Sequence, residues 1–181
     1  MHRIFLAFIF SLICFSSCKK KPEDVMANIK KKYHEINEKQ KDLKAKQVDD
    51  ITNAGGGSIT GYYKDEEVKK IVAEHFSDTC RTFTECYFDE GMLILIIEQN
   101  FIYNCRASQT EEWAKAHNDT VWYDDKKTRL EVNKFYFNEN KLIKWLNPAG
   151  SEIKEKTPRF IDKESELWAQ TIILMKQLKE Q

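Results

Sequence analysis

Three segments of the chain share one pattern, and this pattern constrains the fold more than any other feature of the sequence. Each segment has two adjacent aromatic residues, then two polar residues, with an aliphatic residue six positions after the first aromatic. The segments begin at Tyr62, Tyr87 and Tyr136. An apolar run that is interrupted by polar turn residues and then resumes is typical of a β-hairpin. The copies are unequally spaced, which excludes a strict solenoid.

The pattern therefore predicts three successive hairpins. They are expected over residues 58–76, 82–104 and 129–147, with turns at residues 64–67, 89–91 and 138–140. Residues 92–98, MLILIIE, lack polar alternation, which indicates a central strand buried on both faces. Because side chains alternate along a strand, we expect one face to carry Leu93, Leu95 and Ile97 and the other to carry Ile94 and Ile96.

A long helix is predicted before the hairpins, over residues 22–51. Pro22 suits a first helical turn, and the acidic residues after it complement the helix N-terminus. Its apolar stripe consists of Met26, Ile29, Tyr33, Ile36 and Leu43. The stripe could dock on the domain or pair with another chain in a coiled coil. We favour docking, because a narrow stripe on a charged helix gains little stability alone. AGGGS, residues 54–58, is expected to end the helix and act as a hinge.

A second long helix is predicted at the end of the chain, over residues 162–180, with Asp162 or Ser165 as its cap. Its apolar face is formed by Leu167, Thr171, Leu174, Met175 and Leu178. Between the second and third hairpins, Ser108 and Glu111 suggest a capping box before a short helix in a long excursion. The predicted fold class is α+β, an antiparallel meander of about six strands flanked by an N-terminal and a C-terminal helix.

The first residues of the chain have the composition of a secretory signal. Arg3 precedes an apolar run over residues 4–15, and two serines lead to Cys18. The run is too short for a bilayer-spanning helix, which needs about 20 apolar residues, and it fits the apolar region of a signal peptide.

Residues 15–18, Phe-Ser-Ser-Cys, resemble the lipobox of bacterial lipoproteins, and SCKKKPED resembles the start of envelope lipoproteins from Bacteroidota. Phe15 departs from the leucine that is commonest in the motif. The resemblance implies that Cys18 is acylated and becomes the first mature residue, with palmitate or a similar acyl chain as anchor. It also implies a signal peptide over residues 1–17. A lipidated basic tether with its helix and glycine hinge would follow over residues 18–57, and an α+β domain over residues 58–181.

Charge is unevenly distributed, although the chain is neutral overall. Residues 19–47 carry ten lysines and five acidic residues, and residues 48–181 carry 18 basic and 24 acidic residues. A basic segment beside an anionic leaflet gains about 1 kcal/mol per Lys or Arg, so these lysines suit either membrane proximity or a solvated tether. An acidic domain on an exported chain makes nucleic acid a poor partner.

Five cysteines are present, and three of them, Cys80, Cys86 and Cys105, lie beyond Cys18. An odd number allows at most one internal disulfide, with one thiol left over. An oxidising periplasm permits such a bridge. If one forms, Cys80–Cys105 is favoured, because both residues are expected just outside the strand cores.

No catalytic constellation is evident in the sequence. Nucleophile-elbow, phosphate-loop and zinc-protease motifs are absent, and no cofactor or metal spacing is found. The histidines beyond the signal, His34, His75 and His117, each stand alone. Glu85, Glu98 and Glu131 fall on predicted strands and could converge as carboxylates, although solvated strand faces explain them more simply. The sequence does not indicate an enzyme.

Aromatic residues are enriched on the predicted strands, and they provide the candidate binding face: Tyr62, Tyr87, Tyr136 and Trp145. Aromatic rings interleaved with charges suit recognition of a protein or a glycan. The alternative is that these rings simply pair across strands. Residues 119–121, DTV, resemble the O-glycosylation sequon of Bacteroidota envelope proteins, which would make Thr120 the acceptor.

Together these features predict a lipid-anchored cell-envelope protein at the outer membrane, on its periplasmic or surface side. Its domain is expected to be a non-catalytic binding module for a macromolecular partner. Two alternatives stay open from the sequence: a periplasmic enzyme or enzyme inhibitor, and a structural spacer at the outer membrane.

Overall fold

The three predicted hairpins are present and adjoin one another in one antiparallel sheet. The computed structural model describes residues 22–180. Each strand pairs with the next along the chain. The strands are β1 (Lys44–Asp49), β2 (Gly57–Lys64), β3 (Glu67–Phe76), β4 (Cys80–Asp89), β5 (Met92–Ile102), β6 (Arg129–Asn138) and β7 (Lys141–Leu146). The predicted α+β meander is confirmed, with seven strands instead of about six. The predicted signal peptide and Cys18 lie outside the described residues.

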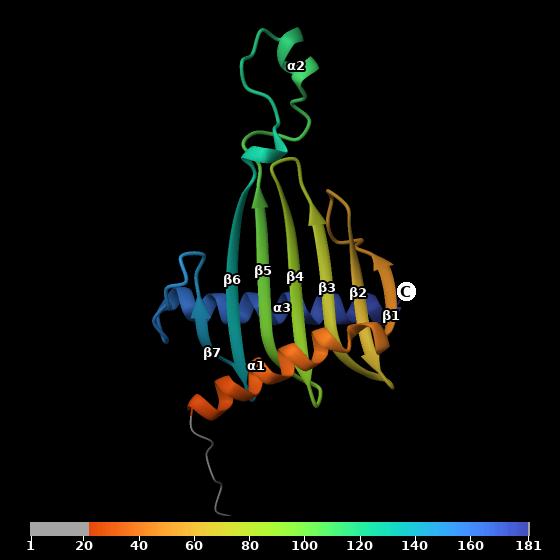
Figure 1. The fold of residues 1–181 in the computed structure, drawn as a ribbon, viewed down its shortest axis with the longest axis vertical. Helices are drawn as coiled ribbons and strands as arrows, with labels where there is room; N and C mark the ends of the chain where they lie inside the picture. Colours follow the sequence, from red (N-terminus) through yellow and green to blue (C-terminus); the bar gives the residue numbers. More distant parts are fainter. Residues whose placement is uncertain (1–21, 181) are drawn as a thin grey trace, which may run out of the picture.

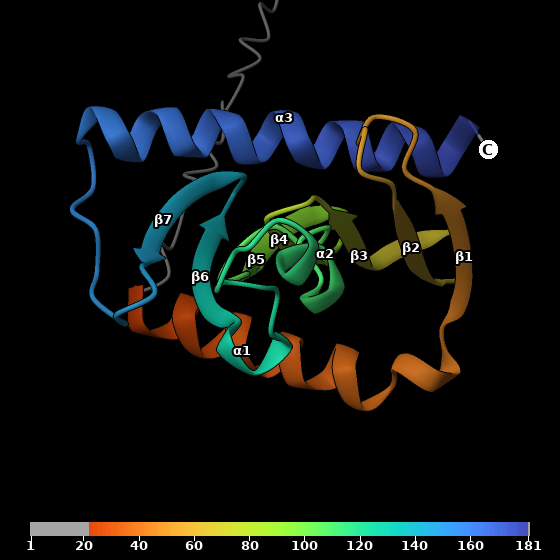
Figure 2. The ribbon, with the colours of Figure 1, turned by 90° about the horizontal axis from the view of Figure 1, so that it is seen from above.

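Two long helices cover opposite faces of this sheet. Helix α1 (Pro22–Glu38) crosses one face near one end of the strands, and α3 (Pro158–Glu180) crosses the other face nearer their middle (Figures 1 and 2). A short helix, α2 (Glu111–Ala116), lies in the excursion between β5 and β6. Two 3₁₀ turns, η1 (Gln40–Asp42) and η2 (Asp125–Lys127), complete the elements. The result is a single sheet between two helical layers.

The predicted helix over residues 22–51 is too long. Helix α1 ends at Glu38, and residues 44–49 form the edge strand β1, in which Val48 pairs with Ile59 of β2. Val48 is buried while the residues on either side of it are exposed, which is the alternation of a half-buried strand. The lysines that made this segment look like a charged helix are also typical of an edge strand, where they discourage pairing with another sheet.

The predicted hinge at residues 54–58 is instead part of the connection between β1 and β2. A side chain on Gly55 would collide with the backbone carbonyl of Phe76, and one on Gly57 with that of Glu74. Glycine is therefore required here because the connection passes close to the end of β3. The segment joins two paired strands and does not separate two bodies.

Asp50 ties this connection to α3. Its carboxylate accepts hydrogen bonds from the amide and hydroxyl of Thr52, at 2.9 and 2.7 Å, and from Gln177 Nε2 at 3.0 Å. His75 Nε2 lies 2.7 Å from the second carboxylate oxygen. Burial alone would raise the pKa of Asp50, but these hydrogen bonds and the neighbouring histidine hold that pKa below its ordinary value.

Helix α1 is docked on the sheet, as expected from its narrow stripe. Ile29 and Ile36 are buried against Tyr87, Leu95 and Tyr136. Tyr33 meets the ring of Tyr87 edge-on, with centroids 5.0 Å apart. Packing of this kind, and not helix propensity, provides most of the stability of a short helix.

Helix α3 packs on the opposite face through Leu167, Thr171, Leu174 and Leu178, four of the five residues predicted for its apolar face. The fifth, Met175, is half-buried beside them. The helix begins four residues earlier than predicted, at Pro158. Thr157, and not Asp162 or Ser165, is its cap, because its hydroxyl accepts the amide of Phe160 at 3.3 Å. Pro158 suits the first position because proline has no amide hydrogen to satisfy there.

Strand β5 is buried on both faces, as predicted, but two of its residues, Leu93 and Ile94, face the opposite way from the prediction. Leu93 shares a cluster with Ile96, whereas Ile94, Leu95 and Ile97 pack beneath α1. The cause is an irregularity in the pairing with β4, where Tyr87 opposes Leu95 and Phe88 opposes Leu93. Ile94 is the extra residue, and this β-bulge inverts the alternation on its N-terminal side.

We expect Ile96→Ala and Leu95→Ala each to lower the free energy of unfolding by about 2–5 kcal/mol, because each removes a buried side chain and leaves a cavity. The two residues test opposite faces of β5, since Ile96 packs under α3 and Leu95 under α1. Urea denaturation followed by circular dichroism measures the loss. Ile172→Ala is the control, because Ile172 is 58% exposed on α3. A neutral result at either core position would show that its face is not closed by a helix.

Candidate functional site

The aromatic residues predicted to form a binding face are largely buried. Tyr87 is 0% exposed and Tyr136 8% exposed beneath α1, while Trp145 is 5% exposed on the α3 side of the sheet. Tyr62 is half-buried. Trp145 donates its indole N–H to Asn133 Oδ1 at 3.0 Å. These four residues therefore do not meet on one exposed surface, because the two helices cover the sheet where the rings lie.

A different part of the α1 side of the sheet is uncovered. An α-helix is about 10 Å across, whereas a strand of ten residues extends for about 33 Å, so one crossing helix covers only part of the strands. Helix α1 lies across the end of the strands opposite to α2 (Figure 1). The pairing register brings two rows of side chains together on the remaining part: Phe76, Arg81, Phe101 and Leu130, then Glu74, Phe83, Gln99 and Val132.

We call these two rows the open face. Phe76 and Leu130 are exposed, and the other apolar members are half-buried. Neighbouring strands contribute one residue each to a row, so the apolar side chains of β3, β4, β5 and β6 form a continuous surface. Contiguous exposed apolar surface on a folded domain is typical of an interaction site.

Arg81 lies at the centre of the open face. Its guanidinium is 4.8 Å from the ring centroid of Phe101 and 5.2 Å from that of Phe83. The two rings meet edge-on, 5.8 Å apart. Within residues 22–180 Arg81 has no salt bridge, and its buried Nε has no hydrogen-bond partner. Contact with the rings restrains the planar guanidinium, whose N–H groups match the geometry of a carboxylate.

The same end of the sheet is polar on its other side. There Thr82 donates to Asn100 at 2.9 Å, Asn100 donates to Glu98 at 3.1 Å, and Lys163 lies 3.4 Å from Glu98. This end of the sheet is thus polar on the α3 side, whereas apolar side chains predominate on the α1 side.

Residues 103–128 form an excursion that projects beyond this end of the sheet (Figure 1). Its base is ordered by Asp78, which accepts the amide and hydroxyl of Ser108, each at 3.0 Å. Thr110, not Ser108, caps α2, since its hydroxyl accepts the amide of Trp113. Trp113, Val121 and Trp122 are exposed on the excursion. Thr120, the residue in the glycosylation-like sequence, is exposed beside them.

The candidate carboxylates do not converge. Glu85 lies on the α1 side, where Lys70 Nζ is 2.6 Å away, whereas Glu98 and Glu131 lie on the α3 side. Glu131 pairs with Arg129 at 3.0 Å. In the described part of the chain no group of three metal-binding side chains is found.

The three described cysteines are free thiols, so the Cys80–Cys105 bridge is not formed in the structure. Cys86 is fully buried against α3, where burial raises the pKa of its thiol to about 12. A thiol with so high a pKa is not a nucleophile near neutral pH. Cys80 lies at the start of β4, and its Sγ is 3.2 Å from the Ser77 hydroxyl, at hydrogen-bond distance.

Comparison with known proteins identifies no relative. No protein-family model, curated protein or solved structure matches this chain. Among residues 22–180, no helix is long and apolar enough to cross a membrane.

Proposed function

We propose that the protein is a lipid-anchored cell-envelope protein whose domain binds another protein through the open face. One observation carries the proposal: an apolar surface on a sheet is left uncovered, with an arginine restrained between two rings at its centre. Phenylalanine and arginine are enriched in the buried centres of protein interfaces. An arginine without a salt bridge suits a partner that supplies a carboxylate from an acidic side chain or a chain terminus.

The position of the tether supports this function. The first turn of α1 shares a groove with Asn138 and Ile143 of the β6–β7 hairpin, whereas the excursion joins β6 at its other end. These two ends of β6 are about 30 Å apart at 3.3 Å per residue. A lipid on Cys18, four residues before α1, would hold the β6–β7 hairpin nearer the membrane. The open face and the excursion would then point away from it.

The test is capture of the partner from envelope membranes with the native anchored protein, followed by affinity measurement with the purified partner. We expect Arg81→Ala to weaken binding by about 30-fold or more, the effect of removing a central hot-spot residue. Arg129→Ala is the matched control. Arg129 lies at the same end of the sheet, but it is exposed and paired with Glu131, so its removal should change affinity little.

A second set of variants separates a protein from a glycan partner. Phe83→Ser should act like Arg81→Ala, whereas Trp113→Ala and Trp122→Ala on the excursion should have smaller effects. Circular dichroism and a thermal melt establish that each variant is folded. A partner whose affinity is unchanged by both Arg81→Ala and Phe83→Ser would contradict the proposed function. A glycan whose binding is weakened only by Trp113→Ala and Trp122→Ala would also contradict the proposed function.

A further inference from the structure

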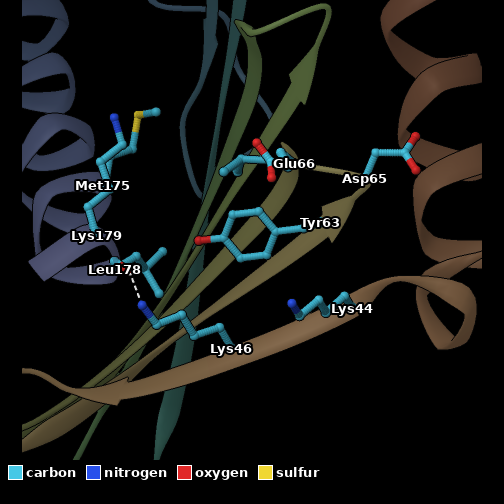
Figure 3. A pocket seen from close by; sticks show the side chains of 9 residues that line it. Lys44, Lys46, Tyr63, Asp65, Glu66, Met175, Leu178 and Lys179 are labelled. Atoms are coloured by element: carbon cyan, nitrogen blue, oxygen red, sulfur yellow. Dashed lines mark hydrogen bonds between the residues drawn. The ribbon is translucent and has the colours of Figure 1, made fainter. Parts of the chain in front are cut away.

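A cavity lies at the opposite end of the strands from the open face, on the α3 side. It occupies the corner where the last turns of α3 lie over β1, β2 and the start of β3 (Figure 3). Its volume is about 330 Å³. Sites for small molecules range from about 300 to 1,000 Å³, so this corner pocket has room for a small ligand only.

The floor of the corner pocket is apolar. Val68, Met175 and Leu178 line it, and all three belong to or pack against the main core cluster under α3. A ligand on this floor would bury apolar surface of its own, at about 25 cal/mol per Å² removed from water. The floor therefore favours a ligand with an apolar body.

The rim of the pocket has more cationic than anionic side chains. Lys44, Lys46 and Lys179 line it, together with Asp65 and Glu66. Lys46 donates to the carbonyl oxygen of Leu178 at 2.7 Å, and in the described part of the chain none of the three lysines has a carboxylate partner. Lys44 and Lys46 reach into the pocket, while the carboxylate of Asp65 is turned away from Leu178 (Figure 3). The rim thus has a net positive charge, which favours an anionic group.

Tyr63 supplies a neutral donor between floor and rim. Its ring lies over Gly61, since a Cβ at that position would be 2.8 Å from both the ring and its hydroxyl oxygen. The hydroxyl points towards α3 (Figure 3). It makes no hydrogen bond to another described residue. Burial raises the pKa of Tyr63, so the hydroxyl keeps its proton and remains a donor at neutral pH.

We propose that the corner pocket binds a small carboxylate with a short apolar body. The carboxylate accepts hydrogen bonds from Lys44 and the Tyr63 hydroxyl, and the body lies on Val68, Met175 and Leu178. The anchor lipid of the protein itself is a poorer occupant. Helix α1 begins at the β7 edge of the sheet, whereas the pocket lies at the β1 edge (Figures 1 and 2). The inference does not depend on the proposed function of the open face.

The test is equilibrium dialysis of labelled octanoate against the lipidated protein in nanodiscs, with empty nanodiscs as the blank. We expect saturable binding of octanoate, and binding of 1-octanol, its uncharged counterpart, at least about tenfold weaker, because a hydrogen bond to a charged group contributes more than a neutral one. Lys44→Gln should weaken octanoate binding about tenfold. Lys41→Gln is the control, because Lys41 is exposed in η1 outside the pocket.

Gly61→Ala provides a steric test, since its methyl group displaces the Tyr63 ring and should weaken octanoate binding strongly. Gly61→Ala could fail to fold, but Lys44→Gln tests the same pocket without that risk, because the side chain of Lys44 is exposed and lies outside the core. Three results would each overturn the proposal. They are no saturable octanoate binding, equal binding of octanol, and unchanged affinity in Lys44→Gln.

Discussion

Cys18→Ala is expected to abolish labelling of the protein by palmitate and to release it from the membrane fraction. Each methylene group buried in a bilayer contributes about 0.8 kcal/mol, and stable anchoring requires two or more acyl chains. A variant without the thiol has no position for the first chain, so the whole contribution is lost. Metabolic labelling and detergent partitioning measure the change. Cys105→Ala is the control, because Cys105 lies in the excursion and should leave labelling intact.

The lysines after Cys18 cannot replace the proposed lipid anchor. Lys19, Lys20 and Lys21 would together contribute about 3 kcal/mol beside an anionic leaflet, and this attraction is screened by salt. Any membrane association that these lysines alone provide should therefore disappear at high ionic strength. Continued palmitate labelling of the variant would show that Cys18 is not the acylated residue.

The hairpins could be predicted because their information is local. Turn residues at positions 65, 90 and 139 follow aromatic pairs. In the structure each is the first residue of a two-residue hairpin loop and has the positive φ that such a loop requires. The register of each hairpin follows from its turn. The bulge in β5 could not be foreseen, since the run of five apolar residues from Leu93 to Ile97 gives no sign of which face each one takes.

The end of α1 could not be predicted, because residues 39–47 have nearly the same composition in either state. Four lysines with few apolar residues are typical of the exposed side of a helix, and they are equally typical of an edge strand. Pairing with β2 decides that this segment is a strand, because Ile59 of β2 lies opposite Val48. The local sequence pattern does not contain this contact.

The candidate site was missed for a related reason. Arg81, Phe83, Gln99 and Phe101 alternate along β4 and β5, and this alternation was visible in the sequence. Which part of the sheet stays open depends on where α1 crosses it, and no single segment encodes that. Two of the chosen tyrosines, Tyr87 and Tyr136, lie nearer the turns, where α1 crosses the sheet, so they are core residues.

The position of α1 is held by a buried charged network around Lys70 of β3. Its Nζ lies 2.6 Å from Glu85, 2.9 Å from Asn37 Oδ1 and 3.1 Å from Gln40 Oε1, so its three protons each have an acceptor. The same nitrogen is 5.0 Å from the ring centroid of Tyr87. Asn37 lies in α1 and Gln40 in η1, so Lys70 joins the end of the helix to the sheet.

Lys70→Met is expected to lower the free energy of unfolding by about 3–5 kcal/mol, because removing one member of a buried ion pair leaves the other charge unpaired. The loss would leave Glu85 without its cation and two amides of the α1–η1 segment without their donor. Urea denaturation measures the change. Lys69→Met is the matched control. Lys69 also pairs with a glutamate at 2.6 Å, but that glutamate is 41% exposed, and an exposed pair contributes about 0–1 kcal/mol.

The double variant Lys70→Met, Glu85→Met separates the charge from the packing. If the cost of Lys70→Met comes from the unpaired carboxylate, replacing both partners by apolar side chains should recover a large part of the stability. Hydrogen exchange would then show whether α1 still protects the sheet beneath it. A Lys70→Met variant no less stable than Lys69→Met would mean that α1 is held by Ile29 and Ile36 alone. In that case the boundary of the open face would be set by apolar packing and not by the charged network.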